Sequence, residues 1–252
     1  MLQVDIARER RAQRNLSVTL AGCESEVLAA QKLRWRVFAD ELGARLDTPV
    51  HGVDCDRFDE HCEHLIVRDD DNGRIVGCYR ILPPEAARHT GGYYSETEFD
   101  LGRLDHLRPQ LVEIGRSCID ADYRQNAAVI ALLWSGLARY MLATGHQYLI
   151  GCASISLADG GHNAAAIFNN LGAHMAPPEY RVFPKLRLPL ERLTPHPACV
   201  MPPLVKGYLR AGADVCGEPA WDPDFNTADL PLLLTMSRLD ARYAKHFVQR
   251  AA

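Results

Sequence analysis

The sequence predicts a mixed α/β (α+β) domain in which a mostly antiparallel central sheet is flanked by helices. Two apolar segments, 64–68 and 74–82, have the composition of strands, and an Asn-Gly pair between them is typical of a hairpin turn. Segments 26–42 and 129–144 instead carry apolar residues at helical spacing. Because a hairpin interrupts the alternation of strands and helices, this order argues against a doubly wound nucleotide-binding fold.

The remaining elements are expected on either side of this hairpin. Further strands are predicted at 16–21, 111–119, 148–153 and 181–188, the last of them closing the core, and a short helix at 163–171. Gly43 and Gly172 follow the first and the short helix, as is typical of helix C-termini. Residues 44–62 form a polar, acid-rich loop that is either plain surface or a substrate-binding loop.

The chain is expected to comprise a flexible N-terminus at 1–15, a core at 16–193 and a C-terminal extension at 194–252. From about residue 194 the composition becomes proline-rich, and a helix at 204–211, a strand at 230–236 and a terminal helix follow. These apolar pieces are too short to build their own core. We therefore predict that the extension packs on the core.

Composition excludes several classes of protein. The 252 residues carry a formal net charge of -4, which argues against general nucleic-acid binding. No apolar run approaches the length of a membrane span, and the basic first residues lack the apolar region of a secretory signal. The eight cysteines form no CxxC pair, as expected of free thiols in a reducing cytosol. Cysteine and histidine positions match no usual zinc spacing, so we expect no metal.

The most informative stretch runs from 111 to 134. A short apolar strand carries Glu113 and Arg116 and leads through a turn into an apolar helix. Backbone amides at a helix start can bind phosphate. The candidate ligands for the phosphate of a pantetheine-linked acyl donor are therefore Arg124, Asn126, Ala127 and Ala128. Glu113 and Arg116 lie three residues apart, so they face opposite sides of a regular strand unless a bulge intervenes.

In the order helix, hairpin, strand, phosphate turn and helix, the chain resembles the GNAT acyltransferase superfamily. Its first half is similar to one branch, the acyl-homoserine lactone synthases, which take acyl chains from acyl carrier protein. Four motifs occur in the order of that branch: LRWRVF at 33–38, DRFD at 56–59, RILP at 80–83 and EIGR at 113–116. Ala44 stands where those synthases carry a tryptophan, which favours a different acceptor.

A more extensive resemblance runs from residue 16 to the C-terminus. The chain resembles the ornithine Nα-acyltransferases, also labelled hemolysin-like, at 91–101, 113–118, 131–134, 202–208 and 221–225. This resemblance implies that a 3-hydroxyacyl group passes from acyl carrier protein to the α-amine of L-ornithine, giving lyso-ornithine lipid. It implies no bound cofactor, because the donor is carried on phosphopantetheine of the carrier protein. A cytoplasmic enzyme is expected, with peripheral contact to the inner membrane left open.

Acyl transfer to an amine requires a base, and the EIGR motif supplies the candidate. An ammonium group with a pKa of roughly 9 to 10 must lose a proton before its nitrogen can attack a thioester. By the resemblance, Glu113 is the catalytic base, and Arg116 is an anion anchor or positioning residue beside it. The alternative is that Glu113 only pairs with Arg116.

The resemblance also predicts a substrate-binding set, which comprises Arg34, Phe38, Asp56, Asp59 and Arg80. The two aspartates would bind the amines of the acceptor. The arginines would bind its carboxylate or the donor phosphate, because a guanidinium group binds both through paired hydrogen bonds. From the residues alone, solvated loop acids, surface ion pairs and a core position for Phe38 are the alternatives.

An acidic acyl carrier protein needs a basic docking surface. The candidates are Arg181, Lys185 and Arg187, or Lys206 and Arg210, and ordinary solvated charges are the alternative. Two other functions remain open. One is carrier-dependent acylation of another amino acid or signal precursor, and the other is a non-catalytic module that binds acyl carrier protein or lipid.

Overall fold

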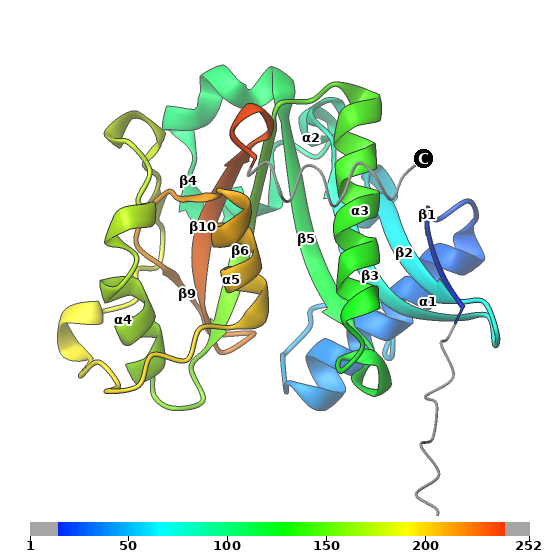
Figure 1. Cartoon of the computed structure of the whole chain (residues 1–252), viewed down its shortest axis with the longest axis horizontal. Coiled ribbons are helices and arrows are strands. Elements are labelled where there is room, and N and C mark those ends of the chain that lie inside the picture. Colours follow the sequence, from blue (N-terminus) through cyan, green and yellow to red (C-terminus); the bar gives the residue numbers. More distant parts are fainter. Residues whose placement is uncertain (1–14, 240–252) are drawn as a thin grey trace, which may run out of the picture.

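A central sheet of eight strands organises residues 15–239, the part of the chain that the computed structural model describes (Figure 1). Its order is β1-β2-β3-β5-β6-β10-β8, and β9 also pairs with β10. The strands are β1 Leu16–Leu20, β2 Glu63–Asp69, β3 Arg74–Leu82, β5 Leu111–Ile119, β6 Tyr148–Ser156, β8 Asp214–Val215, β9 Ala220–Asp222 and β10 Thr227–Thr235. All pairs are antiparallel except the parallel pair β5 and β6. The predicted mixed, mostly antiparallel sheet is confirmed.

Helices cover both faces of this sheet. They are α1 Glu24–Trp35, α2 Pro84–His89, α3 Ala127–Thr144, α4 His162–Asn169 and α5 Pro203–Ala211. Alternate residues of β2 serve the two faces, because side chains of a strand point alternately up and down. Ile66 packs in the cluster with α1, and Leu65 and Val67 pack in the cluster with α3 and α5.

The apolar helix α3 is the core helix of the domain. By length and composition alone it could cross a membrane, but Val129 and Leu133 are buried against the sheet. Gly136 permits this close packing, since a Cβ there would lie 2.8 Å from side-chain atoms of Leu65 and Val18. The apolar character of α3 therefore has a structural explanation within the fold.

The parallel strands β5 and β6 pair along only part of their length. Their register ends at Glu113 and Ile150, although both strands continue beyond this point. At the last contact, a Cβ on Gly151 would lie 2.4 Å from the carbonyl oxygen of Ile114, so glycine permits the close approach. Beyond it the two strands diverge (Figure 1).

Most predicted elements are confirmed, with small shifts at their ends. The segment 26–42 is α1 followed by a π-helical turn, Arg36–Glu41, and Gly43 ends it with φ 75°. The short helix ends at Asn169, so the prediction that Gly172 caps it is wrong, because Gly172 instead begins a 3₁₀ turn.

The predicted core strand at 181–188 is wrong. Only Phe183–Pro184 (β7) forms a strand, and its partner is β4 (Phe99–Asp100) in a separate two-stranded sheet, while Arg187 makes an isolated bridge with Ala220. Proline alone does not explain the difference, because β10 carries Pro231 opposite Cys152 within a central ladder. The place beside β6 is taken by β10.

The segment 194–252 is more than an extension packed on the core. Its strand β10 pairs with β6 from Thr227 opposite Ser156 to Thr235 opposite Tyr148, so it belongs to the central sheet. The predicted helix at 204–211 is confirmed as α5. The predicted terminal helix and the flexible N-terminus lie outside the described residues, apart from Asn15 and the first residues after β10.

Replacing Gly151 by alanine is expected to destabilise the fold by about 1–3 kcal/mol, because the methyl group meets the fixed backbone carbonyl of Ile114. Gly172→Ala is the matched control, since a Cβ there meets nothing within 4 Å. Urea unfolding of both variants measures the difference. Equal stability of the two variants would contradict the close approach of β5 and β6.

Candidate active site

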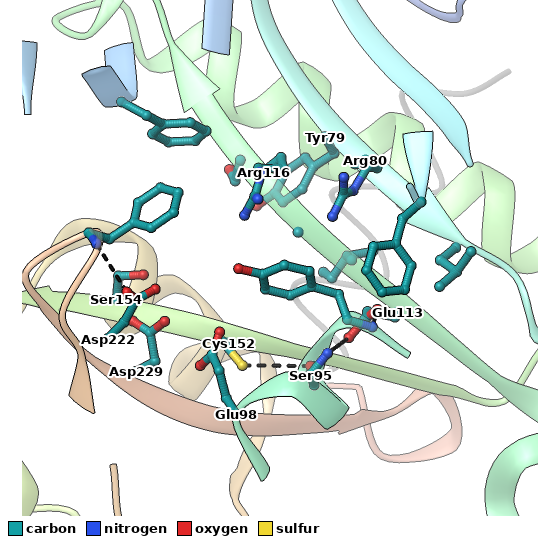
Figure 2. A pocket seen from close by; sticks show the side chains of 18 of the residues that line it. Tyr79, Arg80, Ser95, Glu98, Glu113, Arg116, Cys152, Ser154, Asp222 and Asp229 are labelled. Atoms are coloured by element: carbon teal, nitrogen blue, oxygen red, sulfur yellow. Dashed lines mark hydrogen bonds between the residues drawn. The ribbon is translucent and has the colours of Figure 1, made fainter. Parts of the chain in front are cut away.

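A cavity of about 240 Å³ lies where β5 and β6 diverge (Figure 2). Strand β5 lines it from Glu113 to Ser117, and β6 contributes Cys152 and Ser154. Other lining residues come from α5, from the loop that follows α2 and from the segment around β9 and β10. The cavity therefore depends on segments that are far apart in the sequence.

A β-bulge in β5 brings both charged residues of the EIGR motif to this cavity. One residue of β3, Tyr79, stands opposite two residues of β5, Arg116 and Ser117. Arg116 accommodates the extra residue with φ 50°, a backbone conformation that is uncommon for a residue with a side chain. Glu113 and Arg116 therefore both line the cavity, whereas a regular strand would place them on opposite faces.

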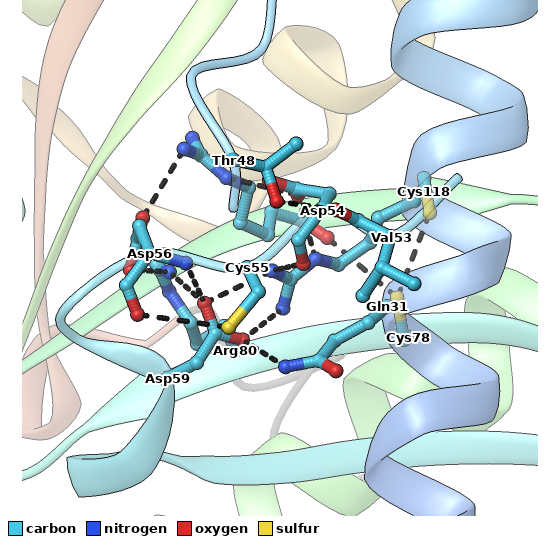
Figure 3. A network of polar contacts seen from close by, with 12 residues as sticks. Gln31, Thr48, Val53, Asp54, Cys55, Asp56, Asp59, Cys78, Arg80 and Cys118 are labelled. Atoms are coloured by element: carbon cyan, nitrogen blue, oxygen red, sulfur yellow. Dashed lines mark hydrogen bonds and ion pairs between the residues drawn. The ribbon is translucent and has the colours of Figure 1, made fainter. Parts of the chain in front are cut away.

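Three arginines and three aspartates form a closed ring of ion pairs beside the cavity (Figure 3). Each aspartate stands between two arginines, with nitrogen–oxygen distances of 2.7 to 3.3 Å. The order around this charge ring is Arg34, Asp59, Arg80, Asp56, Arg116 and Asp54, which returns to Arg34. The ring ties the loop before β2 to α1, β3 and β5.

Two members of the charge ring are sealed from solvent. The side chains of Arg34 and Asp59 are 1% and 3% exposed, and neither lines the cavity. Burial alone would raise the pKa of Asp59, but the hydrogen bond from Arg34 and the charges of Arg34 and Arg80 hold it well below its usual range. Arg34 and Asp59, which the sequence predicted as substrate ligands, are thus engaged in holding the loop, whereas Arg80 and Arg116 reach the cavity.

Glu113 lies at the floor of the cavity and is 4% exposed. Its carboxylate accepts hydrogen bonds from the backbone N–H groups of Tyr94 and Ser95, both at 2.6 Å, and from the Ser95 hydroxyl at 2.5 Å. Burial raises the pKa of Glu113 above its ordinary value, although these hydrogen bonds and the charge of Arg80 act in the opposite direction. A buried carboxyl with a raised pKa is a suitable proton acceptor near neutral pH.

The aromatic ring of Tyr94 lies between the two arginines that line the cavity. The Cζ atoms of Arg80 and Arg116 lie 5.5 and 4.7 Å from the ring centre of Tyr94. Phe38, a predicted substrate-binding residue, lines the cavity and packs edge-on against Phe225 at 5.6 Å. Asp56 does not line the cavity and instead faces a neighbouring groove.

The predicted phosphate turn lies at the start of α3 and does not line the cavity. Arg124 pairs with Glu41 and donates a hydrogen bond to the carbonyl of Ile119 at 3.1 Å. The side-chain oxygen of Asn126 accepts the N–H of Ala128 at 3.0 Å and so caps the helix. Arg124 and Asn126 therefore have structural contacts of their own, and Ala127 and Ala128 are exposed.

Several residues of the site were missed by sequence reasoning. Asp54 completes the charge ring, and Ser95 contacts the predicted base. Three acids also line the cavity: Glu98, Asp222 and Asp229. Segments 91–101 and 221–225, which resemble those of the ornithine Nα-acyltransferases, contain some of these residues. That resemblance was the sequence signal that could have pointed to them. No local pattern indicates that they meet.

Comparisons with known proteins find relatives that cover most of the chain. The chain is 36% identical to an L-ornithine N(alpha)-acyltransferase from Brucella abortus over 92% of this chain and 89% of that protein. An L-ornithine N(alpha)-acyltransferase from Rhodobacter capsulatus is 34% identical over 92% and 95%. The chain belongs to the L-ornithine N(alpha)-acyltransferase family. It is therefore an acyltransferase.

The fold is that of the wider superfamily. The model of the acetyltransferase (GNAT) domain matches residues 33–135. The crystal structure of the acyl-homoserine lactone synthase LasI, 16% identical, superposes with a TM-score of 0.55 over 94% of this chain and 96% of that one. The GNAT-like fold and the resemblance to ornithine Nα-acyltransferases that the motifs indicated are confirmed.

Replacing Arg34 by glutamine is expected to destabilise the protein by about 3–5 kcal/mol, because Asp54 and Asp59 keep their charges without their buried partner. Arg45→Gln is the control, since Arg45 and Asp224 form an exposed pair, for which a loss below about 1 kcal/mol is expected. Chemical unfolding at neutral pH measures both.

The dependence of the free energy of unfolding on pH, in the acidic range, gives a second measurement on the same variant. The pKa of Asp59 is lowered in the folded state, so its pairing contributes fully above its unfolded value of about 4 and is lost as the pH falls below that value. The stability gap between wild type and Arg34→Gln should narrow on acidification. A gap that is independent of pH would contradict the role of Asp59.

Proposed function

We propose that this acyltransferase transfers a 3-hydroxyacyl group from acyl carrier protein to the α-amine of L-ornithine, giving lyso-ornithine lipid. The names of the relatives support ornithine as the acceptor. The observation that carries the proposal is a single cavity with guanidinium groups on one side and carboxylates on the other (Figure 2). A diamino acid carries both matching charges.

In the proposed reaction, the amine nitrogen attacks the carbonyl carbon of the thioester. A C–N bond forms, the C–S bond breaks, and the carrier leaves as a thiol. The α-ammonium group first gives one proton to the Ser95 oxygen, while the hydroxyl proton of Ser95 passes to Glu113. The proton that the nitrogen loses as the C–N bond forms goes to the departing sulfur. The 2.5 Å hydrogen bond between Ser95 and Glu113 and the raised pKa of Glu113 support this route.

Arg80 and Arg116 are the proposed ligands of the acceptor carboxylate. Both line the cavity, and the ring of Tyr94 lies between them. The Nε atom of Arg116 is buried and donates no hydrogen bond, although it lies 3.2 Å from an oxygen of Asp54. This atom faces the charge ring, which keeps the guanidinium group of Arg116 in a fixed position at the cavity.

The donor is proposed to dock along α5 and to bring its phosphopantetheine toward the start of α3. One face of α5 lines the cavity through Leu204 and Tyr208, while Lys206 and Arg210 are exposed on another face. Of the other basic candidates, Arg187 is less suitable. Arg187 already pairs with Glu191 and Glu218.

We further propose a cytoplasmic location, in peripheral contact with the inner membrane that receives the lipid product. The eight cysteines are free thiols, as a reducing compartment allows.

Glu113→Gln is expected to lower kcat by about 10²- to 10⁴-fold, because the amide cannot accept the proton. In wild type, kcat should fall as the pH drops through the pKa of Glu113, which lies above its ordinary value. This fall of kcat at low pH should be absent in the variant. Product formation from 3-hydroxyacyl-carrier protein and ornithine is followed by mass spectrometry. Glu60→Gln, at an exposed acid, is the control. Unchanged turnover in Glu113→Gln would exclude Glu113 as the base.

Reversing both charges with Lys206→Glu and Arg210→Glu is expected to raise KM for the acyl-carrier protein by about tenfold or more, because an acidic partner is repelled. KM for ornithine should not change. Lys32→Glu is the control, since Lys32 is an exposed cation on α1 across the sheet. An unaltered KM for the carrier would place the docking surface elsewhere.

A further inference from the structure

Three carboxylates converge at one end of the cavity. Glu98 precedes β4, Asp222 ends β9 and Asp229 lies within β10. One oxygen of each lies within 4.8 Å of the others, and all three line the cavity. Figure 2 shows them across the cavity from Arg80 and Arg116.

These carboxylates, here called the acid cluster, have no cation of their own in residues 15–239. No arginine, lysine or histidine of the described chain forms an ion pair with any of them. The Oε2 atom of Glu98 is fully enclosed and accepts no hydrogen bond. Asp229 is 5% exposed and accepts hydrogen bonds from the Thr227 hydroxyl, at 3.0 Å, from Ser154 and from Glu98. Buried negative charge without a partner is costly, so a positive ligand would relieve it.

The pKa values of the cluster are shifted in the direction expected for crowded, buried carboxylates. Burial, followed by the negative charges of Asp229 and Asp222, raises the pKa of Glu98 well above its ordinary value. Burial also raises the pKa of Asp229. Asp222 has one oxygen engaged by the N–H groups of Asp224 and Phe225, at 2.8 and 3.0 Å, which fixes the turn that carries it.

We propose that the acid cluster binds the side-chain ammonium group of the acceptor and so selects a diamino acid over a neutral one. This inference rests on the proposed function. An ammonium group offers three N–H donors from a compact centre, and the cluster offers one oxygen from each of three residues. Arg80 and Arg116, across the cavity, are left for the carboxylate of the same molecule.

The cluster also accounts for which amine reacts. Nearby carboxylates raise the pKa of an ammonium group, because they favour its charged form. A protonated amine has no lone pair and cannot attack a thioester. The side-chain amine is therefore held unreactive at the acid cluster, and the α-amine is left to lose its proton toward Ser95 and Glu113.

A selectivity assay tests this assignment. The acceptors are L-ornithine and L-norvaline, which has the same carbon chain without the side-chain amine, and the readouts are kcat, KM and the acylated nitrogen from fragment-ion mass spectra. Wild type is expected to prefer ornithine by about 100-fold or more in kcat/KM. In Asp229→Asn and, separately, Glu98→Gln, this preference should fall by about tenfold or more, mainly through KM for ornithine, because one charged contact is lost. Acylation of the side-chain amine should become detectable.

Asp224→Asn is the matched control. Asp224 lies on the same turn but is 63% exposed and does not line the cavity, so the preference should remain. Circular dichroism checks that each variant folds. A wild type that acylates norvaline as well as ornithine, or variants that keep the full preference, would overturn the acid cluster while leaving acyl transfer itself intact.

Binding without an acyl donor separates the two proposals. Ornithine is expected to raise the thermal midpoint of wild type but not of Asp229→Asn, and norvaline should raise neither. This outcome supports the acid cluster even if no amine is acylated and the proposed function fails. A midpoint raised by Ca²⁺ or Mg²⁺, and not by ornithine, would identify a metal site and overturn the assignment.

Discussion

Six charged side chains hold the loop before β2 against α1, β3 and β5. In this charge ring, every aspartate lies between two arginines, so no buried charge in it lacks a partner of opposite sign. Arg34 and Asp59 are sealed inside, and Arg80 and Arg116 extend from the same ring to the cavity. The positions of the two guanidinium groups at the site therefore depend on buried ring members, Arg34 and Asp59 among them, that do not line the cavity.

The cavity exists because two parallel strands separate. The bulge at Arg116 turns that side chain toward the space between β5 and β6, and Gly151 permits the close contact just before the strands part. Arginines from the first half of the chain occupy one side of this space. Strand β10, from the tail, brings Asp229 to the other side. The tail is thus needed both for the sheet and for the charge balance of the site.

Local patterns were sufficient for most of the secondary structure. The Asn-Gly turn and the apolar strands beside it predicted β2 and β3, and the EIGR motif predicted that Glu113 and Arg116 act together. The prediction of a core strand at 181–188 was wrong because a later strand, β10, fills the place beside β6, and β7 pairs with β4 instead. Arg34 matched a family motif, but a motif does not distinguish a substrate ligand from a residue that positions one.

The sequence by itself determined the family, the type of fold and the acyltransferase chemistry, because these follow from ordered motifs and short-range periodicity. Only the tertiary structure decided which charges neutralise one another and which remain for a ligand. The pairing of Asp54 in the ring and the meeting of Glu98 with Asp229 join residues distant along the chain. Such contacts follow from strand order, from the bulge and from the entry of the tail into the sheet, and no local pattern encodes them.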